Sequence, residues 1–301
     1  MTITPPATIA FIGLGMMGKP MASRLAGAGF TLRVFDLSQK AVSDFVGAHP
    51  TALATASAKA AAQGADALIT MLPDGKAVRA AVLEGRDAAV EGLGAGALVM
   101  DMSSSNPVDT QKLARDLAGR GLALLDAPVS GGVKRAVDGS LSIMVGGAAA
   151  DLERARPVFG AMGKTITLCG PAGAGHALKA LNNYLSAAGV VAMCEALIVG
   201  ENFGLDPGTM VDVFKTSTGK SNATEVKGRQ FVVPRNFAAG FSMALMAKDL
   251  RTAGDVASHL KLHVPNLEQA VAYWTAADGK LGKGADHTEI FRYAEMLAEE
   301  E

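Results

Sequence analysis

The chain has 301 residues, of which 49 % are hydrophobic and 19 % charged, and its formal net charge is −1. This composition supports a large buried core and excludes a disordered chain. A net charge of −1 gives no indication of the concentrated basic surface that nucleic acid or an anionic membrane requires, so neither is an expected partner. Cys169 and Cys194 are too few for a disulfide framework and lack companions for a metal site, which predicts a cytoplasmic protein that binds no metal.

Two segments of the sequence bear on targeting to a membrane, and neither indicates it. Residues 1–12 have no basic segment of the kind that opens a signal peptide. The most apolar long segment, 184–200, is interrupted by Glu195 and is short for a bilayer. It predicts a buried helix.

Strands and helices alternate through the first half of the chain. Short apolar strands are predicted at 8–12, 31–36, 67–71, 97–101, 123–126, 141–145 and 165–169. Ala-rich helical stretches, such as 20–28 and 110–120, lie between several of them. This alternation predicts an α/β fold with a doubly wound parallel sheet of the Rossmann type, covered by helices on both faces.

Helical patterns replace strands after Gly170. Residues 176–203 predict one long helix that ends before Gly204. The remainder predicts helices broken by glycine and proline, at Pro207, Gly219, Pro234, Gly240, Pro265 and Gly282. We therefore expect an α/β domain over 1–170 and an all-helical domain over 171–301, which begins with a long interdomain helix.

A glycine-rich turn lies between the first strand and the first helix. Its residues are Gly13-Leu14-Gly15-Met16-Met17-Gly18. In this setting the first glycine permits the tight turn, the second lets the backbone approach a pyrophosphate, and the third lets helix and strand pack closely. The N–H groups at the start of the helix then face the phosphates. The turn predicts a dinucleotide site.

Asp36 ends the second predicted strand, where a carboxylate accepts hydrogen bonds from the adenosine ribose diol and repels a 2′-phosphate. The next three residues include no arginine to hold such a phosphate. The sequence therefore predicts NAD rather than NADP as the cofactor.

Four motifs together resemble the β-hydroxyacid dehydrogenases, a family that includes 3-hydroxyisobutyrate dehydrogenase and tartronate semialdehyde reductase. They are the turn at 13–21 (GLGMMGKPM), residues 126–132 (DAPVSGG), residues 173–183 (GAGHALKALNN) and Lys248-Asp249-Leu250. The resemblance covers nearly the whole chain. It implies a Rossmann-type domain, a helical domain for substrate binding and oligomerisation, and a homodimer or homotetramer.

The second motif ends a strand with Pro128 and two glycines, which let a ligand approach the backbone. Loops at the carboxyl ends of strands bind ligands in open α/β sheets. By resemblance, Ser130 and the N–H groups of Gly131 and Gly132 hold the substrate carboxylate.

Lys179, Asn182 and Asn183 share one face of the long helix, while Leu178, Leu181 and Leu185 are expected to bury against the core. Spacing alone fits a solvated polar stripe equally well. By resemblance, Lys179 is the catalytic lysine, and Asn183 positions it or the substrate, with Asn182 beside the substrate. A base must accept the hydroxyl proton, so the pKa of Lys179 is expected to be lowered by burial and nearby positive charge.

Further cofactor contacts follow from the resemblance. Lys248 is expected at the nicotinamide end, with a surface ion pair to Asp249 as its alternative role. Leu72, Pro73 and Ser104 are expected beside the nicotinamide mononucleotide half, whereas Ala77 stands where relatives often carry an amide.

Substrate selectivity is expected in the segment 218–224. Asn222 stands near the position of a tryptophan in 3-hydroxyisobutyrate dehydrogenases, and Lys134 and Arg135 follow the Gly-Gly turn. These residues suggest a substrate more polar than hydroxyisobutyrate, although they fit solvent-facing side chains as well.

The main prediction is an NAD-dependent dehydrogenase of a small β-hydroxy acid. The rival within the family is a tartronate semialdehyde type reductase. A non-catalytic dinucleotide-binding module and an imine reductase are disfavoured because Lys179 is present, and phosphogluconate dehydrogenases have a longer second domain.

Overall fold

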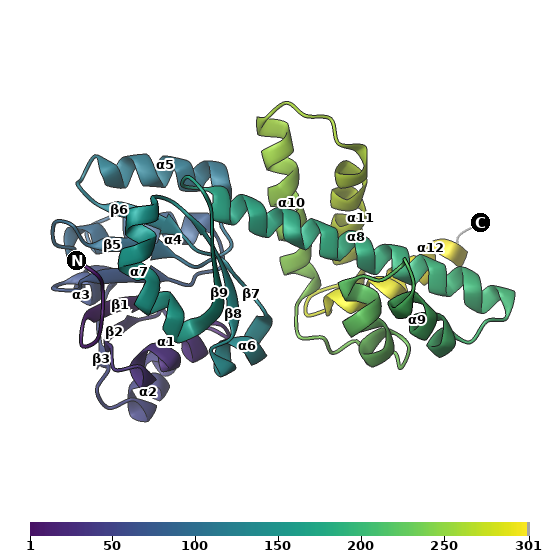
Figure 1. Ribbon diagram of the computed structural model, residues 1–301, viewed down its shortest axis with the longest axis horizontal. Helices are drawn as coiled ribbons and strands as arrows, with labels where there is room; N and C mark the ends of the chain where they lie inside the picture. The colour runs from purple at the N-terminus through teal and green to yellow at the C-terminus, as the bar shows by residue number, and fades with distance from the viewer. Residues whose placement is uncertain (300–301) are drawn as a thin grey trace. The chain divides into compact units, whose positions relative to one another are not determined.

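The computed structural model describes residues 1–299, coloured from purple to yellow along the chain in Figure 1. The contacts within the chain divide it into two compact units, one ending at Lys179 and one beginning at Ala180. Each unit is described by itself. The domain boundary near Gly170 stays a prediction.

The first unit is built on one sheet with the strand order β3-β2-β1-β4-β5-β6-β8-β7, and β9 pairs with β8. Its strands are β1 (Thr8–Ile12), β2 (Thr31–Phe35), β3 (Leu53–Ala54), β4 (Ala67–Thr70), β5 (Leu98–Asp101), β6 (Ala123–Asp126), β7 (Val129–Ser130), β8 (Leu141–Gly146) and β9 (Gly163–Gly170). All seven predicted strands are present. The two-residue strands β3 and β7 were not predicted from the sequence.

The strands from β3 to β6 pair in parallel, which confirms the doubly wound prediction for this part of the sheet. The sheet is mixed at its other side, where β8 runs antiparallel to both β6 and β7. The alternation of strands and helices does not encode strand direction. The direction of a strand depends on whether the connection before it crosses to the opposite end of the sheet or enters the next strand from the same end.

Helices cover both faces of the sheet (Figure 1). They are α1 (Gly18–Gly27), α2 (Gln39–Ala48), α3 (Ala58–Ala62), α4 (Gly75–Val82), η1 (Ala89–Glu91), α5 (Pro107–Ala118), α6 (Gly132–Asp138) and α7 (Ala149–Met162). Side chains alternate across β1. Ile9 and Phe11 pack with Met21 and Leu25 of α1 in one core cluster, whereas Ala10 belongs to the cluster on the other face.

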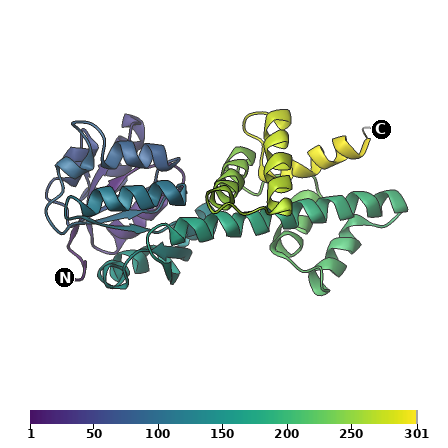
Figure 2. The ribbon, with the colours of Figure 1, turned by 90° about the horizontal axis from the view of Figure 1, so that it is seen from above.

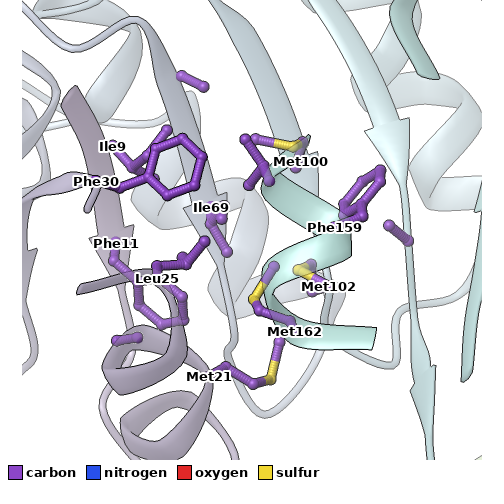
Figure 3. Packing of buried hydrophobic residues seen from close by; sticks show 14 of the residues in the cluster. Ile9, Phe11, Met21, Leu25, Phe30, Ile69, Met100, Met102, Phe159 and Met162 are labelled. Atoms are coloured by element: carbon purple, nitrogen blue, oxygen red, sulfur yellow. The ribbon is translucent and has the colours of Figure 1, made fainter. Parts of the chain in front are cut away.

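Figure 3 shows the first of these clusters, in which Met100 of β5 and Ile69 of β4 meet Phe159 and Met162 of α7. The aromatic and sulfur-containing side chains fill the space between strands and helices. This packing holds the carboxyl ends of the strands in fixed positions.

The long helix α8 (Ala174–Phe203) begins in the first unit and continues through the second (Figure 2). It confirms the predicted helix and begins two residues earlier. Gly204, at φ +98°, follows it in the left-handed region that the predicted stop requires. By length and composition α8 is able to cross a membrane, with mean hydropathy 1.5 over an 18-residue window, 44 % of which is buried within the chain.

The second unit is built of helices within residues 180–299, with one isolated antiparallel bridge between Ser242 and Asp286. It contains, besides α8, α9 (Pro207–Thr216), η2 (Ala223–Val232), α10 (Met243–His259), α11 (Pro265–Leu281), η3 (His287–Glu289) and α12 (Ile290–Glu299). Helices α10 and α11 lie side by side (Figure 1 and Figure 2). Cys194 and Leu197 of α8 pack with Leu250, Trp274 and Phe291 in its core.

The expected burial of three leucines on α8 is wrong. Leu178, Leu181 and Leu185 are 43 %, 41 % and 71 % exposed. The helix buries a different face, which includes Ala187, Val190 and Cys194. An apolar helix offers several apolar faces, and its own sequence does not state which of them meets the core.

Candidate active site

The glycine-rich turn has the geometry that a bound pyrophosphate requires. Gly13 has φ +101°, and a Cβ there would collide with the carbonyl oxygen of Met71. A Cβ at Gly18 would collide with the carbonyl oxygen of Gly13, so helix α1 lies directly against the turn. Gly15 has open space around its Cβ position, with no other heavy atom within 4 Å. The residues fit a dinucleotide phosphate approaching at Gly15.

The start of α1 also suits an anion. Met17 occupies its N-cap position and makes no side-chain cap hydrogen bond. The N–H of Lys19 already donates to the carbonyl oxygen of Gly15, at 3.0 Å, and Pro20 has no N–H, so a bound anion would be held by the other N–H groups of the turn and by the positive end of the helix dipole. Leu14 and the exposed Met16 complete the turn.

Asp36 joins the turn to the second strand. Its carboxylate accepts hydrogen bonds from the backbone N–H of Leu14, at 2.6 Å, and of Ser38, at 2.7 Å. The first bond fixes the glycine-rich turn, and each oxygen keeps a further lone pair. Asp36 can therefore hold the turn and accept from a ribose hydroxyl.

The other predicted cofactor residues follow β4 and β5, which are neighbours in the sheet. The N–H of Leu72 donates to Ser103 Oγ at 2.9 Å, which ties the two loops together. Pro73 is exposed and Ser104 half-buried. All three predicted residues, Leu72, Pro73 and Ser104, therefore lie at the carboxyl edge of the sheet.

Ser130 ends β7, and the next two residues begin α6. Gly131 and Gly132 have φ values of +129° and +66°, which side-chain-bearing residues rarely adopt. Both glycines are exposed, as are Lys134 and Arg135 on α6. The backbone of these two glycines is accordingly exposed to solvent.

A buried polar network lies where β5 and β6 end, and the sequence patterns did not predict it. Asp126 accepts from the backbone N–H of Gly173, at 2.7 Å, and of His176, at 2.9 Å. The His176 ring contacts Thr110 Oγ1 at 2.8 Å and the carbonyl oxygen of Ser103 at 3.1 Å. All four of these contacts lie in the buried interior.

Asp101 completes this network from the end of β5. Its carboxylate accepts from Thr70 Oγ1, at 2.9 Å, and from Ser105 Oγ, at 2.8 Å, and lies 3.7 Å from His176 Nε2. The first turn of α8 is thus bound to the carboxyl ends of two central strands. Lys179 follows His176 by three residues, so its position on the helix is set by this anchor.

The side chain of Asn183 is hydrogen-bonded to a residue of α10. It is 7 % exposed, and its Nδ2 donates to Asp249 Oδ2 at 2.5 Å. The other oxygen of Asp249 lies 3.3 Å from Lys248 Nζ, so the two residues form an ion pair, although Asp249 is buried and the pair is not the surface pair weighed as an alternative. Asn182 is exposed, and its Nδ2 donates to Asn183 Oδ1 at 3.3 Å. Asn183, Asp249 and Lys248 form one connected polar chain.

The segment 218–224 leads into η2, a ten-residue helix of π type, a rare geometry often found at functional sites. Asn222 at its start is exposed. The Ser221 hydroxyl accepts from the N–H of Thr224 at 3.3 Å. The buried charged residue of η2 is Lys227, 9 % exposed, whose Nζ donates to Ser186 Oγ at 3.0 Å. Sequence reasoning missed Lys227 because no periodic pattern marks the buried face of a π helix.

Burial lowers the pKa of Lys227 from its ordinary value of 10.5 to about 8. Between these values the unfolded chain binds a proton that the folded chain does not, so this group makes unfolding free energy rise with pH. Replacing Lys227 by methionine is therefore expected to raise the unfolding free energy at pH 7 by about 3 kcal/mol. The difference in unfolding free energy between the variant and the wild type should become smaller as the pH rises towards 10.5.

Urea unfolding of both proteins at pH 7, 8, 9 and 10 measures this difference. The comparison must be between the two proteins, because burial raises the pKa of Cys194 and Tyr273 and gives the opposite trend in both. A gain that stays constant with pH would contradict the titration of Lys227.

Within residues 1–299, no group of three or more histidine, cysteine or acidic side chains is arranged to hold a metal ion. Cys169 and Cys194 are both free thiols.

Comparison with known families and proteins covers nearly the whole chain. Residues 8–170 match the NAD binding domain of 6-phosphogluconate dehydrogenase, and residues 173–294 match the family described as NAD-binding of NADP-dependent 3-hydroxyisobutyrate dehydrogenase. The chain is 42 % identical to an NAD-dependent L-serine dehydrogenase of Pseudomonas aeruginosa over 83 % of this chain and 85 % of that protein.

Two further proteins extend the comparison. The chain is 41 % identical to a 2-(hydroxymethyl)glutarate dehydrogenase of Eubacterium barkeri, covering 81 % of this chain and 80 % of that protein. The solved structure of Mycobacterium tuberculosis 3-hydroxyisobutyrate dehydrogenase with L-serine matches 97 % of this chain and 99 % of that one, at 33 % identity and a TM-score of 0.86. The chain therefore belongs to the β-hydroxyacid dehydrogenase family and is an NAD-dependent oxidoreductase acting on the hydroxyl group of small hydroxy acids.

Proposed function

We propose that Lys179 is the general acid and base of the reaction. The observation that carries this proposal is the buried anchor of α8, in which Asp126 and His176 bind the helix start to the carboxyl end of β6. Ligands in open α/β sheets bind at that edge. Lys179 stands one helical turn beyond His176, where a side chain can reach a ligand at the edge.

The proton transfer is the part of the reaction that this chain's own residues perform. The nicotinamide, when bound, accepts the hydride that leaves the carbinol carbon. Lys179 Nζ accepts the hydroxyl proton in oxidation and, as an ammonium, polarises the carbonyl and returns the proton in reduction. The Asp249 carboxylate accepts from the Asn183 amide nitrogen, and the Asn183 oxygen accepts from Asn182 Nδ2, which leaves that oxygen one lone pair for Lys179 or the substrate.

The substrate carboxylate is assigned to Ser130 Oγ and the N–H groups of Gly131 and Gly132. Their positive φ values and exposure support this assignment. Asn182 and Asn222, both exposed, are assigned to the substrate's other polar groups. Lys248 is assigned to the nicotinamide end, with Asp249 balancing its charge.

Asp36 supports a preference for NAD over NADP. Its carboxylate is fixed by two backbone N–H groups and would lie against a 2′-phosphate. The exposed Leu37 and Ser38 next to it offer that phosphate no positive charge.

The proposed substrate is a β-hydroxy acid of the 3-hydroxyisobutyrate type or a more polar relative. The names of the relatives suggest L-serine and 2-(hydroxymethyl)glutarate as members of the set to test. We further propose a cytoplasmic homodimer or homotetramer that needs neither nucleic acid nor a membrane. A tartronate semialdehyde type reductase is the alternative activity at the same site.

A steady-state assay with NAD or NADP tests this function. The panel consists of 3-hydroxyisobutyrate, D-glycerate, L-serine and 2-(hydroxymethyl)glutarate for oxidation, and tartronate semialdehyde for reduction. We expect NAD to exceed NADP in kcat/KM by at least about tenfold, the effect of about 1.4 kcal/mol. If kcat/KM is highest for the reduction of tartronate semialdehyde, the alternative activity is the correct one. If the protein binds the dinucleotide but turns over none of the compounds, it is a non-catalytic binding module.

A further inference from the structure

Lys227 is a buried amine that the proposed chemistry does not use. It lies in η2, where the other charged side chains, Glu225 and Arg229, are exposed. Lysine is rarely buried to this extent unless a partner balances its charge. The site of Lys227 therefore needs an explanation other than packing, for which methionine or leucine would serve better.

Few groups of the protein balance the positive charge of the buried Lys227 ammonium. Within residues 1–299 its hydrogen bond is to a neutral hydroxyl, Ser186 Oγ, and it takes part in no ion pair. An ammonium has three N–H donors, so at least two are left for another acceptor. Asp286 acts on it only at longer range, and the carboxylate of Asp286 already accepts from the N–H of Gly240, at 2.8 Å, and of Thr288, at 2.9 Å.

The amine reaches the polar face of α8. Ser186 follows Asn183 by three residues and Asn182 by four, so the three side chains are neighbours on that face. The rise from Asn183 to Ser186 is roughly 4.5 Å. The positive charge of Lys227 is thereby held one helical turn from the amides assigned to the substrate.

We propose that Lys227 is a specificity-determining residue whose ammonium binds a second carboxylate of the substrate, remote from the reacting hydroxyl. This inference rests on the proposed function, because it places the amides of α8 beside the substrate. A carboxylate would supply the missing counter-charge and accept the N–H donors that Ser186 leaves. L-Serine, whose ammonium replaces the methyl of 3-hydroxyisobutyrate on the same side of the molecule, would be repelled by this charge.

Two substrates form a matched pair for the test. 2-(Hydroxymethyl)glutarate is 3-hydroxyisobutyrate with a CH2COO− group added to its methyl, and its 5-carboxamide analogue removes only the charge. Wild-type enzyme is expected to prefer the dicarboxylate over the carboxamide. Lys227→Met should lower kcat/KM for the dicarboxylate by about 10- to 100-fold, mainly through KM, the range for a lost hydrogen bond between charged groups.

The same variant should change kcat/KM for 3-hydroxyisobutyrate less than about threefold and should raise it for L-serine. Lys227→Arg keeps the charge and should retain the preference for the dicarboxylate. Lys215→Met is the matched control, because Lys215 is a half-buried lysine of the neighbouring α9 that is paired with Asp212 at 2.8 Å. It should leave all the ratios unchanged.

Equal losses on both members of the pair, or a wild type that does not distinguish the dicarboxylate from the carboxamide, would overturn the role of Lys227. If Lys227→Met does not fold, the wild-type comparison and Lys227→Arg still decide the question. Failure of the proposed function has a different signature, namely no NAD reduction by wild-type enzyme with any hydroxy acid.

Discussion

Lys179→Ala is expected to lower kcat for hydroxy-acid oxidation by about 10²- to 10⁴-fold, the usual contribution of a positioned general acid or base. The dissociation constant for NAD should change less than about threefold, because the residues assigned to the dinucleotide lie in the glycine-rich turn and at Asp36. Stopped-flow or steady-state kinetics gives the first quantity, and titration of the coenzyme gives the second.

The control for this variant is Lys112→Ala, which removes an exposed lysine from α5. Addition of methylamine should restore part of the turnover of Lys179→Ala, since a free amine can accept the proton that the side chain no longer accepts. A merely structural lysine would not respond in this way. A variant that keeps more than a tenth of the wild-type kcat would contradict the assignment.

Asp126→Ala is expected to reduce the free energy of unfolding by about 3–5 kcal/mol. The substitution leaves the buried N–H groups of Gly173 and His176 without an acceptor, and each lost hydrogen bond to a charged group contributes about 1.5–3 kcal/mol. Because these bonds anchor the first turn of α8, kcat should also fall in whatever fraction of the variant remains folded. Urea unfolding at pH 7 measures the stability.

Asp138→Ala is the matched control for this prediction. Asp138 is an exposed aspartate at the end of α6 in the same unit, and its removal should change the unfolding free energy by less than about 0.5 kcal/mol. If Asp126→Ala unfolds at the same urea concentration as Asp138→Ala, the buried network does not stabilise the start of α8.

The strands, the long helix and the glycine-rich turn were predictable because each depends on local chemistry. Apolar runs bounded by turns mark the strands, and Gly13 and Gly18 are required where a Cβ would collide with backbone. The four family motifs likewise led to Lys179, Asn183 and Ser130 as candidate site residues. Their roles stay predictions that the kinetic experiments decide.

Other features depend on contacts between segments far apart in the chain. No local sequence pattern predicts the direction of β8, the exposed leucines of α8 or the rare π geometry of η2. His176 looked like an ordinary residue at the start of a helix. Its importance follows from its ring contacts with Thr110 Oγ1 and the carbonyl oxygen of Ser103, and from the carboxylates at the ends of β5 and β6.

The sequence by itself determined the α/β class, the dinucleotide turn and the family, since glycine conformations, apolar periodicity and short motifs are encoded within a few neighbouring residues. The tertiary structure alone decided which polar side chains are buried and with what partners. Burial is a property of the packed chain. The carboxylate of Asp126 accepts from two N–H groups about fifty residues away in the sequence, whereas the buried ammonium of Lys227 has one neutral hydroxyl as its hydrogen-bond partner.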